Sequence, residues 1–175
     1  GGGAGHEPAH VGFVGQGMLT AAIAGDVFAS PSVEAILQAI VATTGKSGCF
    51  LIVKSYTGDR LNFGLAAEKA RAMGYQVDMI IVGDDIALPD VANPRGIAGT
   101  LFVHKLAGHL SEQGKSLEEI ATITKAAAQG IHSIGLALSS CALPYDETGE
   151  LNYAPEIGMG IHGEPGFEKV DIANA

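Results

Sequence analysis

With 175 residues, 47% of them hydrophobic, the chain is long enough and apolar enough to fold around one core. Its net charge is −9 and its ten Lys and Arg form no cluster, which argues against nucleic acid as a partner, because phosphate contacts need a concentrated positive face. No apolar run reaches the roughly 18 residues of a membrane span, and no leader pattern opens the chain, so we expect a cytoplasmic protein without a membrane partner. Cys49 and Cys141 lie in apolar runs and are expected to be buried, reduced thiols.

The chain opens on GGGAGHEPAH, in which residues 6–10 match the H-E-x-x-H pattern of zinc proteases. That pattern binds zinc on a helix, where residues i and i+4 share a face. Pro8 is unfavourable inside a helix and the preceding glycines favour a loop, so we expect no metal site here. The segment also lacks the G-K-[ST] of a phosphate-binding loop. It is therefore expected to present His6 from a glycine-rich loop, with His10 as a secondary candidate; the alternative is an ordinary loop histidine.

Further along the chain, residues 29–45 predict a helix with Ser30 at its N-cap. Residues 49–54 form a continuous apolar run, which is typical of a buried strand. A helix over 61–74 that ends on a C′ glycine and a second buried strand over 77–85 follow. Such a strand–helix–strand unit implies parallel pairing through a right-handed crossover.

Two more helices are expected in the second half of the chain. One spans 96–114, and the next begins after Ser116, whose spacing to Glu119 fits a capping box. Residues 133–141 and 157–163 are predicted to be short strands.

This alternation of helices and apolar strands predicts a single α/β domain over residues 1–175, with a mostly parallel sheet covered by helices on both faces. No shift in composition marks an internal boundary, and the polar stretch 145–156 predicts a surface excursion. Because the chain starts on Gly1 rather than on Met, we expect a piece of a longer polypeptide.

Three glycine-rich turns carry polar side chains, namely GGGAGHEP, KSYTGD and GIHGEPG. In α/β sheets, ligands bind where loops gather at the carboxyl ends of the strands. The turns supply His6, Asp59 and His162, which together offer a general base, an orienting partner and a nucleophile. Lys54 closes the strand before the second turn, whereas His104, on an expected helix, is assigned to packing or solvent.

Four segments carry a resemblance to a known family: GGGAGHEPAH, LIVKSYTGDRLNFGLAAEKA, RGIAGTLFVHKLAG and GMGIHGEPG. Together they resemble the substrate-binding domain of dihydroxyacetone kinases, and they extend over nearly the whole chain. The resemblance implies the first α/β lobe of that domain and phosphorylation of dihydroxyacetone, so that the protein would be a glycerone kinase.

The resemblance also implies roles for individual residues. His162 would hold the substrate carbonyl as a covalent hemiaminal, His6 would be the general base at the hydroxyl that receives phosphate, and Asp59 would assist it. The substrate-binding positions implied by the family are Gly2, Gly3, Ala4, Gly5, His6, Ser30, Lys54 and Asp59. Ala4 and Ser55 depart from the serine and asparagine usual in the family, which affects fine substrate contacts rather than the reacting groups.

The phosphoryl donor is expected outside this segment, which contains no cofactor site of its own. In the family, ATP and Mg²⁺ lie on a separate helical domain, or a phosphohistidine carrier supplies the phosphoryl group through a nucleotide-binding subunit. The resemblance further implies a homodimer, with a helical kinase domain or subunit as partner. The alternative is a non-catalytic, dihydroxyacetone-sensing or regulatory subunit on the same scaffold. The joint presence of His6, Asp59 and His162 favours the enzyme.

Overall fold

A computed structural model describes residues 1–139 and 154–171 of the protein. Its centre is a pair of parallel strands, β3 (Cys49–Lys54) and β4 (Val77–Val82), joined by helix α2 (Thr57–Ala72). The strand–helix–strand unit predicted from the apolar runs is therefore confirmed. Helix α2 begins four residues earlier than the expected 61–74, so that Asp59 lies in its first turn rather than in a loop.

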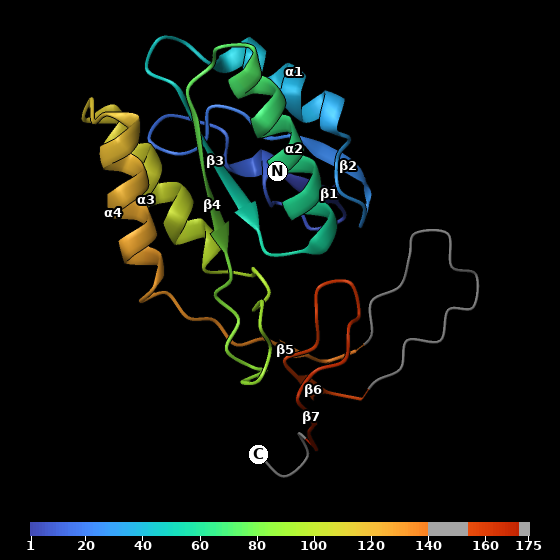
Figure 1. The fold of residues 1–175 in the computed structure, drawn as a ribbon. Helices are drawn as coiled ribbons and strands as arrows, with labels where there is room; N and C mark the ends of the chain where they lie inside the picture. Colours follow the sequence, from blue (N-terminus) through green and yellow to red (C-terminus); the bar gives the residue numbers. More distant parts are fainter. Residues whose placement is uncertain (140–153, 172–175) are drawn as a thin grey trace.

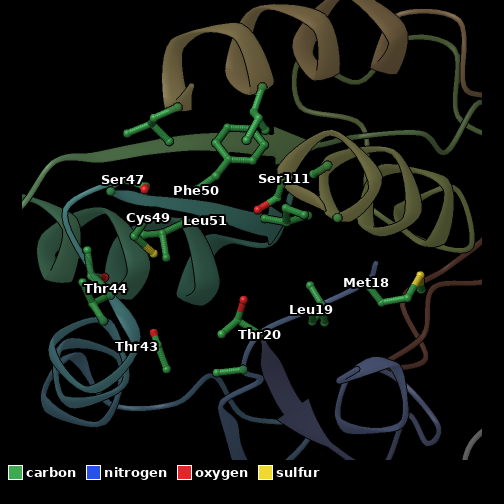
Figure 2. A pocket seen from close by; sticks show the side chains of 18 of the residues that line it. Met18, Leu19, Thr20, Thr43, Thr44, Ser47, Cys49, Phe50, Leu51 and Ser111 are labelled. Atoms are coloured by element: carbon green, nitrogen blue, oxygen red, sulfur yellow. The ribbon is translucent and has the colours of Figure 1, made fainter. Parts of the chain in front are cut away.

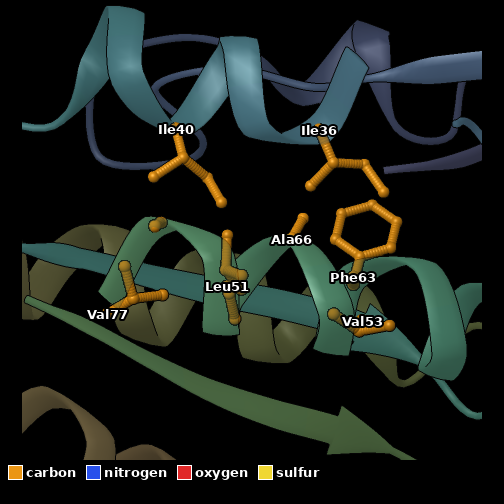
Figure 3. Close-up of a cluster of buried hydrophobic side chains, with 9 residues drawn as sticks. Ile36, Ile40, Leu51, Val53, Phe63, Ala66 and Val77 are labelled. Carbon is orange, nitrogen blue, oxygen red and sulfur yellow. The ribbon is translucent and has the colours of Figure 1, made fainter. Parts of the chain in front are cut away.

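Helices cover both faces of this strand pair (Figure 1). Helices α1 (Val33–Thr43) and α2 pack on one face, and helices α3 (Thr100–Glu112) and α4 (Leu117–Ala128) pack on the other. In Figure 3, Ile36 and Ile40 of α1 point toward Phe63 of α2 and toward the strands. Burial of these side chains stabilises the layered arrangement, at roughly 25 cal/mol per Å² of apolar surface. The predicted α/β fold, with helices on both faces, is confirmed.

The helix ends follow their local sequence signals in part. Ser116 and Glu119 form the predicted capping box of α4, and Gly74 takes the left-handed conformation, with φ +92°, just after α2. The predicted cap of α1 is wrong: Ser32 caps the helix by accepting from the Ala35 backbone N–H. Ser30 instead turns its hydroxyl toward Asp59.

The opening glycine segment forms a second parallel pair, which was not expected. Strand β1 (Gly2–Ala4) pairs with β2 (Ala24–Val27), and a short 3₁₀ helix, η1 (Val11–Phe13), lies between them in the chain. The glycines allow this close approach of backbones, because a Cβ placed on Gly3 would lie 2.7 Å from the Ala29 nitrogen. His6 follows β1 in a bend, as the sequence predicts.

A third, antiparallel sheet lies beyond the carboxyl ends of β3 and β4 (Figure 1). It consists of β5 (Leu136–Ala137), β6 (Glu156–Ile157) and β7 (Glu168–Lys169). The predicted strands over 133–141 and 157–163 are thus much shorter than expected. Residues after β6 form a turn instead, because Gly158 and Gly163 adopt positive φ angles that a strand does not use.

Two expectations concern residues that the structure does not fully describe. Cys141 and most of 145–156 lie outside the described residues, whereas Cys49 is a half-buried free thiol, and burial raises its pKa. Within residues 1–139 and 154–171, no helix is both long and apolar enough to cross a membrane.

Candidate functional site

Two histidines from opposite ends of the chain meet beside β1. The Nε2 atoms of His6 and His162 lie 3.3 Å apart, although the two residues are separated by 156 positions in the sequence. Their ring centroids are 5.0 Å apart and the rings cross at 80°. The structure thus brings together two of the three predicted catalytic side chains and leaves one ring nitrogen of each facing the other.

Two aromatic side chains that the sequence analysis did not select surround these imidazoles. The ring centroid of Tyr56 lies 4.9 Å from that of His162, edge to face, and the centroid of Phe28 lies 5.0 Å from that of His6. Phe28 adopts a left-handed backbone conformation with φ 55°, and a Cβ on Gly5 would lie 2.7 Å from the Phe28 ring. Tyr56 belongs to the YTGD motif and could have been found from it, whereas nothing in the sequence around Phe28 indicates its position.

A second group of polar side chains lies beneath β1. Asp59 is buried in the first turn of α2, where the helix N-terminus favours a negative charge, and accepts a hydrogen bond of 2.5 Å from the Ser30 hydroxyl. A Cβ on Gly2 would lie 3.8 Å from both Asp59 Oδ2 and Lys54 Cε. A side chain at Gly2 would therefore contact both a buried carboxylate and a buried lysine.

Lys54 joins this group to the histidines. It ends β3, is buried, and holds its Nζ 5.7 Å from the Tyr56 ring centroid, on a ring that also contacts His162. Burial lowers the pKa of Lys54, although the carboxylates of Asp59 and Asp84 oppose the effect. Asp59 bonds Ser30, and no hydrogen bond joins it to His6 in the described part of the chain.

The electrostatics of the site keep His6 uncharged. Burial, followed by the neighbouring charge of Lys54 and by His162, lowers the pKa of His6 to about 4. The imidazole is consequently neutral near pH 7 and has a lone pair with which to accept a proton. The remaining predicted binding positions, Gly3, Ala4 and Gly5, lie in β1 or directly after it, beside His6.

The other half of the opening motif serves a different purpose. Residues 6–10 form turns rather than a helix, so His6 and His10 do not share a helical face. His10 is buried, and its Nδ1 lies 2.8 Å from Nε2 of His104 on α3, which is also buried and was expected to pack between helices or face solvent. Across residues 1–139 and 154–171, no group of three or more His, Cys, Asp or Glu is arranged to hold a metal ion.

A cavity of about 470 Å³ lies elsewhere in the molecule. Figure 2 shows Met18, Leu19 and Thr20 facing the end of α1 and the β3 residues Cys49 and Leu51 across it. None of the predicted site residues lines this cavity. The candidate site is instead the group of polar side chains around β1, which consists of two imidazoles, a carboxylate and an ammonium group.

Comparison with known proteins identifies the family to which the chain belongs. The Dak1 domain family matches residues 1–175. The chain is 61% identical to the dihydroxyacetone kinase of Citrobacter freundii, covering all of this chain and 32% of that protein. It is 46% identical to the dihydroxyacetone-binding subunit DhaK of the PTS-dependent dihydroxyacetone kinase 1 of Listeria innocua, covering 98% of this chain and 54% of that subunit.

Two solved structures share the fold. The C. freundii kinase in complex with AMP-PNP and Mg²⁺ superimposes with a TM-score of 0.94 at 61% identity, over 97% of this chain and 32% of that one. The dihydroxyacetone kinase operon co-activator DhaQ superimposes with a TM-score of 0.90 at 36% identity, over 97% of this chain and 54% of that one. The chain spans about a third of the C. freundii kinase and about half of the two other proteins. Since the family match covers every residue, the chain belongs to the Dak1 domain family.

Proposed function

We propose that this chain is the substrate-binding part of a dihydroxyacetone kinase and presents dihydroxyacetone for phosphorylation. The observation that carries the proposal is the 3.3 Å approach of the His6 and His162 Nε2 atoms beside Lys54 and Asp59. One imidazole would hold the substrate and the other would accept its proton. The names and identities of the C. freundii and L. innocua relatives support this assignment.

The proposed tether is a hemiaminal between His162 and the ketone. Nε2 attacks the carbonyl carbon, an N–C bond forms, and the electron pair of the C=O bond moves to the oxygen, which takes up a proton. The imidazole loses its remaining N–H proton, so the adduct is neutral and no atom is gained or lost overall. A polyol without a carbonyl cannot react in this way, and the tether would therefore select ketones.

The roles of the other side chains follow from their charge and position. His6 is neutral near pH 7 and would remove the proton of the hydroxyl that receives the phosphoryl group, a task that typically accelerates a reaction by about 10²- to 10⁴-fold. Asp59 and Lys54, whose side chains lie next to Gly2 of β1, would bind substrate hydroxyls. In the free protein the two imidazoles contact one another, so the substrate must come between them.

We expect no nucleotide site within residues 1–175. The cations near the histidines are Lys54 and Arg95, and Arg95 already pairs with Asp85. We therefore place the phosphoryl donor on another domain or subunit, either as ATP with Mg²⁺ or as a phosphohistidine carrier acting through a nucleotide-binding subunit. The AMP-PNP and Mg²⁺ complex of the longer C. freundii kinase supports the first route. The single-domain organisation of residues 1–175, the homodimer and the cytoplasmic location stay predictions.

A second function is favoured by the likeness to the operon co-activator DhaQ. In that case the chain would be a sensing or regulatory subunit that binds dihydroxyacetone and takes no part in phosphoryl transfer. A pure sensor needs only the tether, whereas this chain also has a neutral His6 and a buried Asp59. These two side chains favour the kinase.

The tether can be tested by mass spectrometry. The full-length protein incubated with dihydroxyacetone and measured under native conditions should gain the mass of one substrate molecule. His162→Ala should lose this adduct, and the matched variant His132→Ala, at an exposed histidine away from the site, should keep it. An adduct that persists unchanged in His162→Ala would refute the assignment.

A further inference from the structure

Both carboxylate oxygens of Glu164 contact His162. Oε2 accepts a hydrogen bond of 3.0 Å from the His162 backbone N–H, and Oε1 lies 3.1 Å from Nδ1 of the same residue. Although burial opposes ionisation, hydrogen bonds from the backbone and from His162 lower the pKa of Glu164 overall. An ionised carboxylate only accepts hydrogen bonds. In the neutral form of the imidazole, this geometry favours a proton on Nδ1 and a lone pair on Nε2.

The ring has little freedom to turn away from this arrangement. Tyr56 and Phe28 both meet the His162 ring edge to face, with centroids 4.9 and 5.9 Å away, and Nε2 is directed at His6. Since a ring flip would exchange the two nitrogens, Glu164 and the aromatic contacts together select which nitrogen is available for reaction.

Arg95 holds the turn that carries both residues. Its guanidinium pairs with Asp85, just beyond β4, and donates a hydrogen bond of 2.5 Å to the Gly158 carbonyl. A Cβ on Gly160 would clash with Glu164 Oε2 and would lie 2.9 Å from Arg95 Nη1, so the two charged groups converge on Gly160. Arg95 Nη1 is buried and has no hydrogen-bond partner among the described residues.

We propose that Glu164 is a positioning residue that fixes His162 as the Nδ1–H tautomer, with Nε2 free to attack, and that Arg95 anchors the turn in which this happens. The consequence for catalysis rests on the proposed function. When Nε2 forms its bond to the carbonyl carbon, the Nδ1 proton passes to Glu164, and the carbonyl oxygen takes a proton from water. Glu164 then returns its proton to solvent, so protons and electrons balance.

The tautomer can be read without any ligand. In the full-length protein labelled with ¹⁵N-histidine, with the His162 signals assigned from their loss in His162→Ala, NMR at pH 7.5 should show a protonated Nδ1 and an unprotonated Nε2. Glu164→Ala should shift the ring toward the Nε2–H form. Glu164→Gln, whose amide oxygen can still accept from Nδ1–H, should retain more of the Nδ1–H form. The matched variant Glu168→Gln, at an exposed glutamate on β7, should give the wild-type spectrum.

Adduct formation with dihydroxyacetone should follow the tautomer. Loss of the carboxylate that orients a metal-bound histidine typically lowers metal affinity or activity by about 10- to 100-fold. By analogy, we expect Glu164→Ala to weaken adduct formation within that range. A proton on Nε2 in the wild-type protein, or an unchanged Nδ1–H form in Glu164→Ala, would overturn the proposal. If Glu164→Ala fails to fold, the wild-type spectrum still shows which ring nitrogen of His162 carries the proton. Failure of the proposed function would appear separately, as a wild-type protein with the Nδ1–H form but no adduct.

Discussion

At the scale of single residues, the proposed function assigns the binding of a ketone and the removal of its proton to two different imidazoles. His162 approaches from the turn after β6, whereas His6 approaches from the end of β1, and only their Nε2 atoms meet. The pKa of His6 is lowered to about 4, which keeps the base unprotonated at neutral pH. Each imidazole can thus be altered without removing the other.

Substitution of His6 should therefore affect turnover more than binding. We expect His6→Ala to lower kcat by about 10²- to 10⁴-fold, the range of a general base, while the adduct on His162 persists. Steady-state kinetics of the full-length enzyme with its donor domain or subunit, together with mass spectrometry of the adduct, measure the two effects. A near-normal kcat with a raised KM would make His6 a binding contact and would favour the sensor.

Asp59 provides a second prediction at this scale. Its carboxylate accepts a hydrogen bond from Ser30 rather than from His6. We therefore expect Asp59 to assist the base by contacting the same substrate molecule. We expect Asp59→Asn to lower kcat as well, and the double variant with His6→Ala to fall little further than His6→Ala alone, because groups that serve one step are not additive. Ser30→Ala, which removes the partner of Asp59 but not its charge, is the matched control and should have a smaller effect. Fully additive losses would assign the two residues to separate steps.

At the scale of secondary-structure elements, the His10–His104 contact joins the loop after β1 to helix α3. The two buried imidazoles lie 2.8 Å apart, and each leaves its other ring nitrogen without a hydrogen-bond partner in the described structure. Burial is the main reason why the pKa of His10 falls to about 2 and that of His104 to about 4, and Lys54 acts on both in the same direction. The pair is stable only while both rings are uncharged.

This contact predicts a loss of stability in mild acid. Both folded-state pKa values lie below the value of about 6.5 for free histidine, so the unfolded chain binds more protons below pH 6.5. Stability should be complete above pH 6.5 and should fall below it, down to about pH 4 for His104 and about pH 2 for His10, by up to about 1.4 kcal/mol per histidine for each pH unit.

The measurement is the midpoint of thermal unfolding between pH 7.5 and 5. His104→Gln should flatten the dependence, whereas His109→Gln, exposed on the same helix, should not. His6, whose pKa is also lowered, contributes to the slope in both variants. An equal slope in wild type and His104→Gln would contradict the assignment.

The sequence predicts those elements whose ends are determined locally. The capping box of α4 and the left-handed Gly74 after α2 are set by residues within one helical turn, and both were found. The cap of α1 was missed because Ser30 and Ser32 are equally good local candidates, and only the distant Asp59 distinguishes them. The Phe28 contact with His6 depends on β1 pairing with β2, for which the glycines of β1 give no apolar pattern.

At the scale of the whole molecule, polar contacts join the antiparallel sheet to the layered part of the described residues. The main one is the ion pair of Arg95 with Asp85, whose side chains are 12% and 4% exposed, together with the hydrogen bond from Arg95 to the Gly158 carbonyl. Gly158 directly follows β6 and leads to His162. The position of the proposed tether therefore depends in part on one half-buried arginine.

Arg95→Met should consequently destabilise the protein and weaken the adduct together. Removing one partner of a buried ion pair leaves an uncompensated charge and typically costs about 3–5 kcal/mol. The stability and the adduct formation of Arg95→Lys should lie between those of the wild type and Arg95→Met, since an ammonium cannot reproduce both contacts of the guanidinium. Thermal unfolding and adduct mass measure the outcome, with the exposed Arg60→Met as control. A normal adduct in a protein of normal stability would show that the arginine is dispensable.

The meeting of His6 with His162 joins residues that lie 156 positions apart, and almost the entire chain is enclosed between them. A contact between such distant parts of a polypeptide forms after nearby helices and strands have formed, because closing a long loop is entropically unfavourable. During refolding, helical structure should therefore return before the capacity to bind ketone. Adduct formation should thus report a late stage of folding, in which the segments that carry His6 and His162 come together.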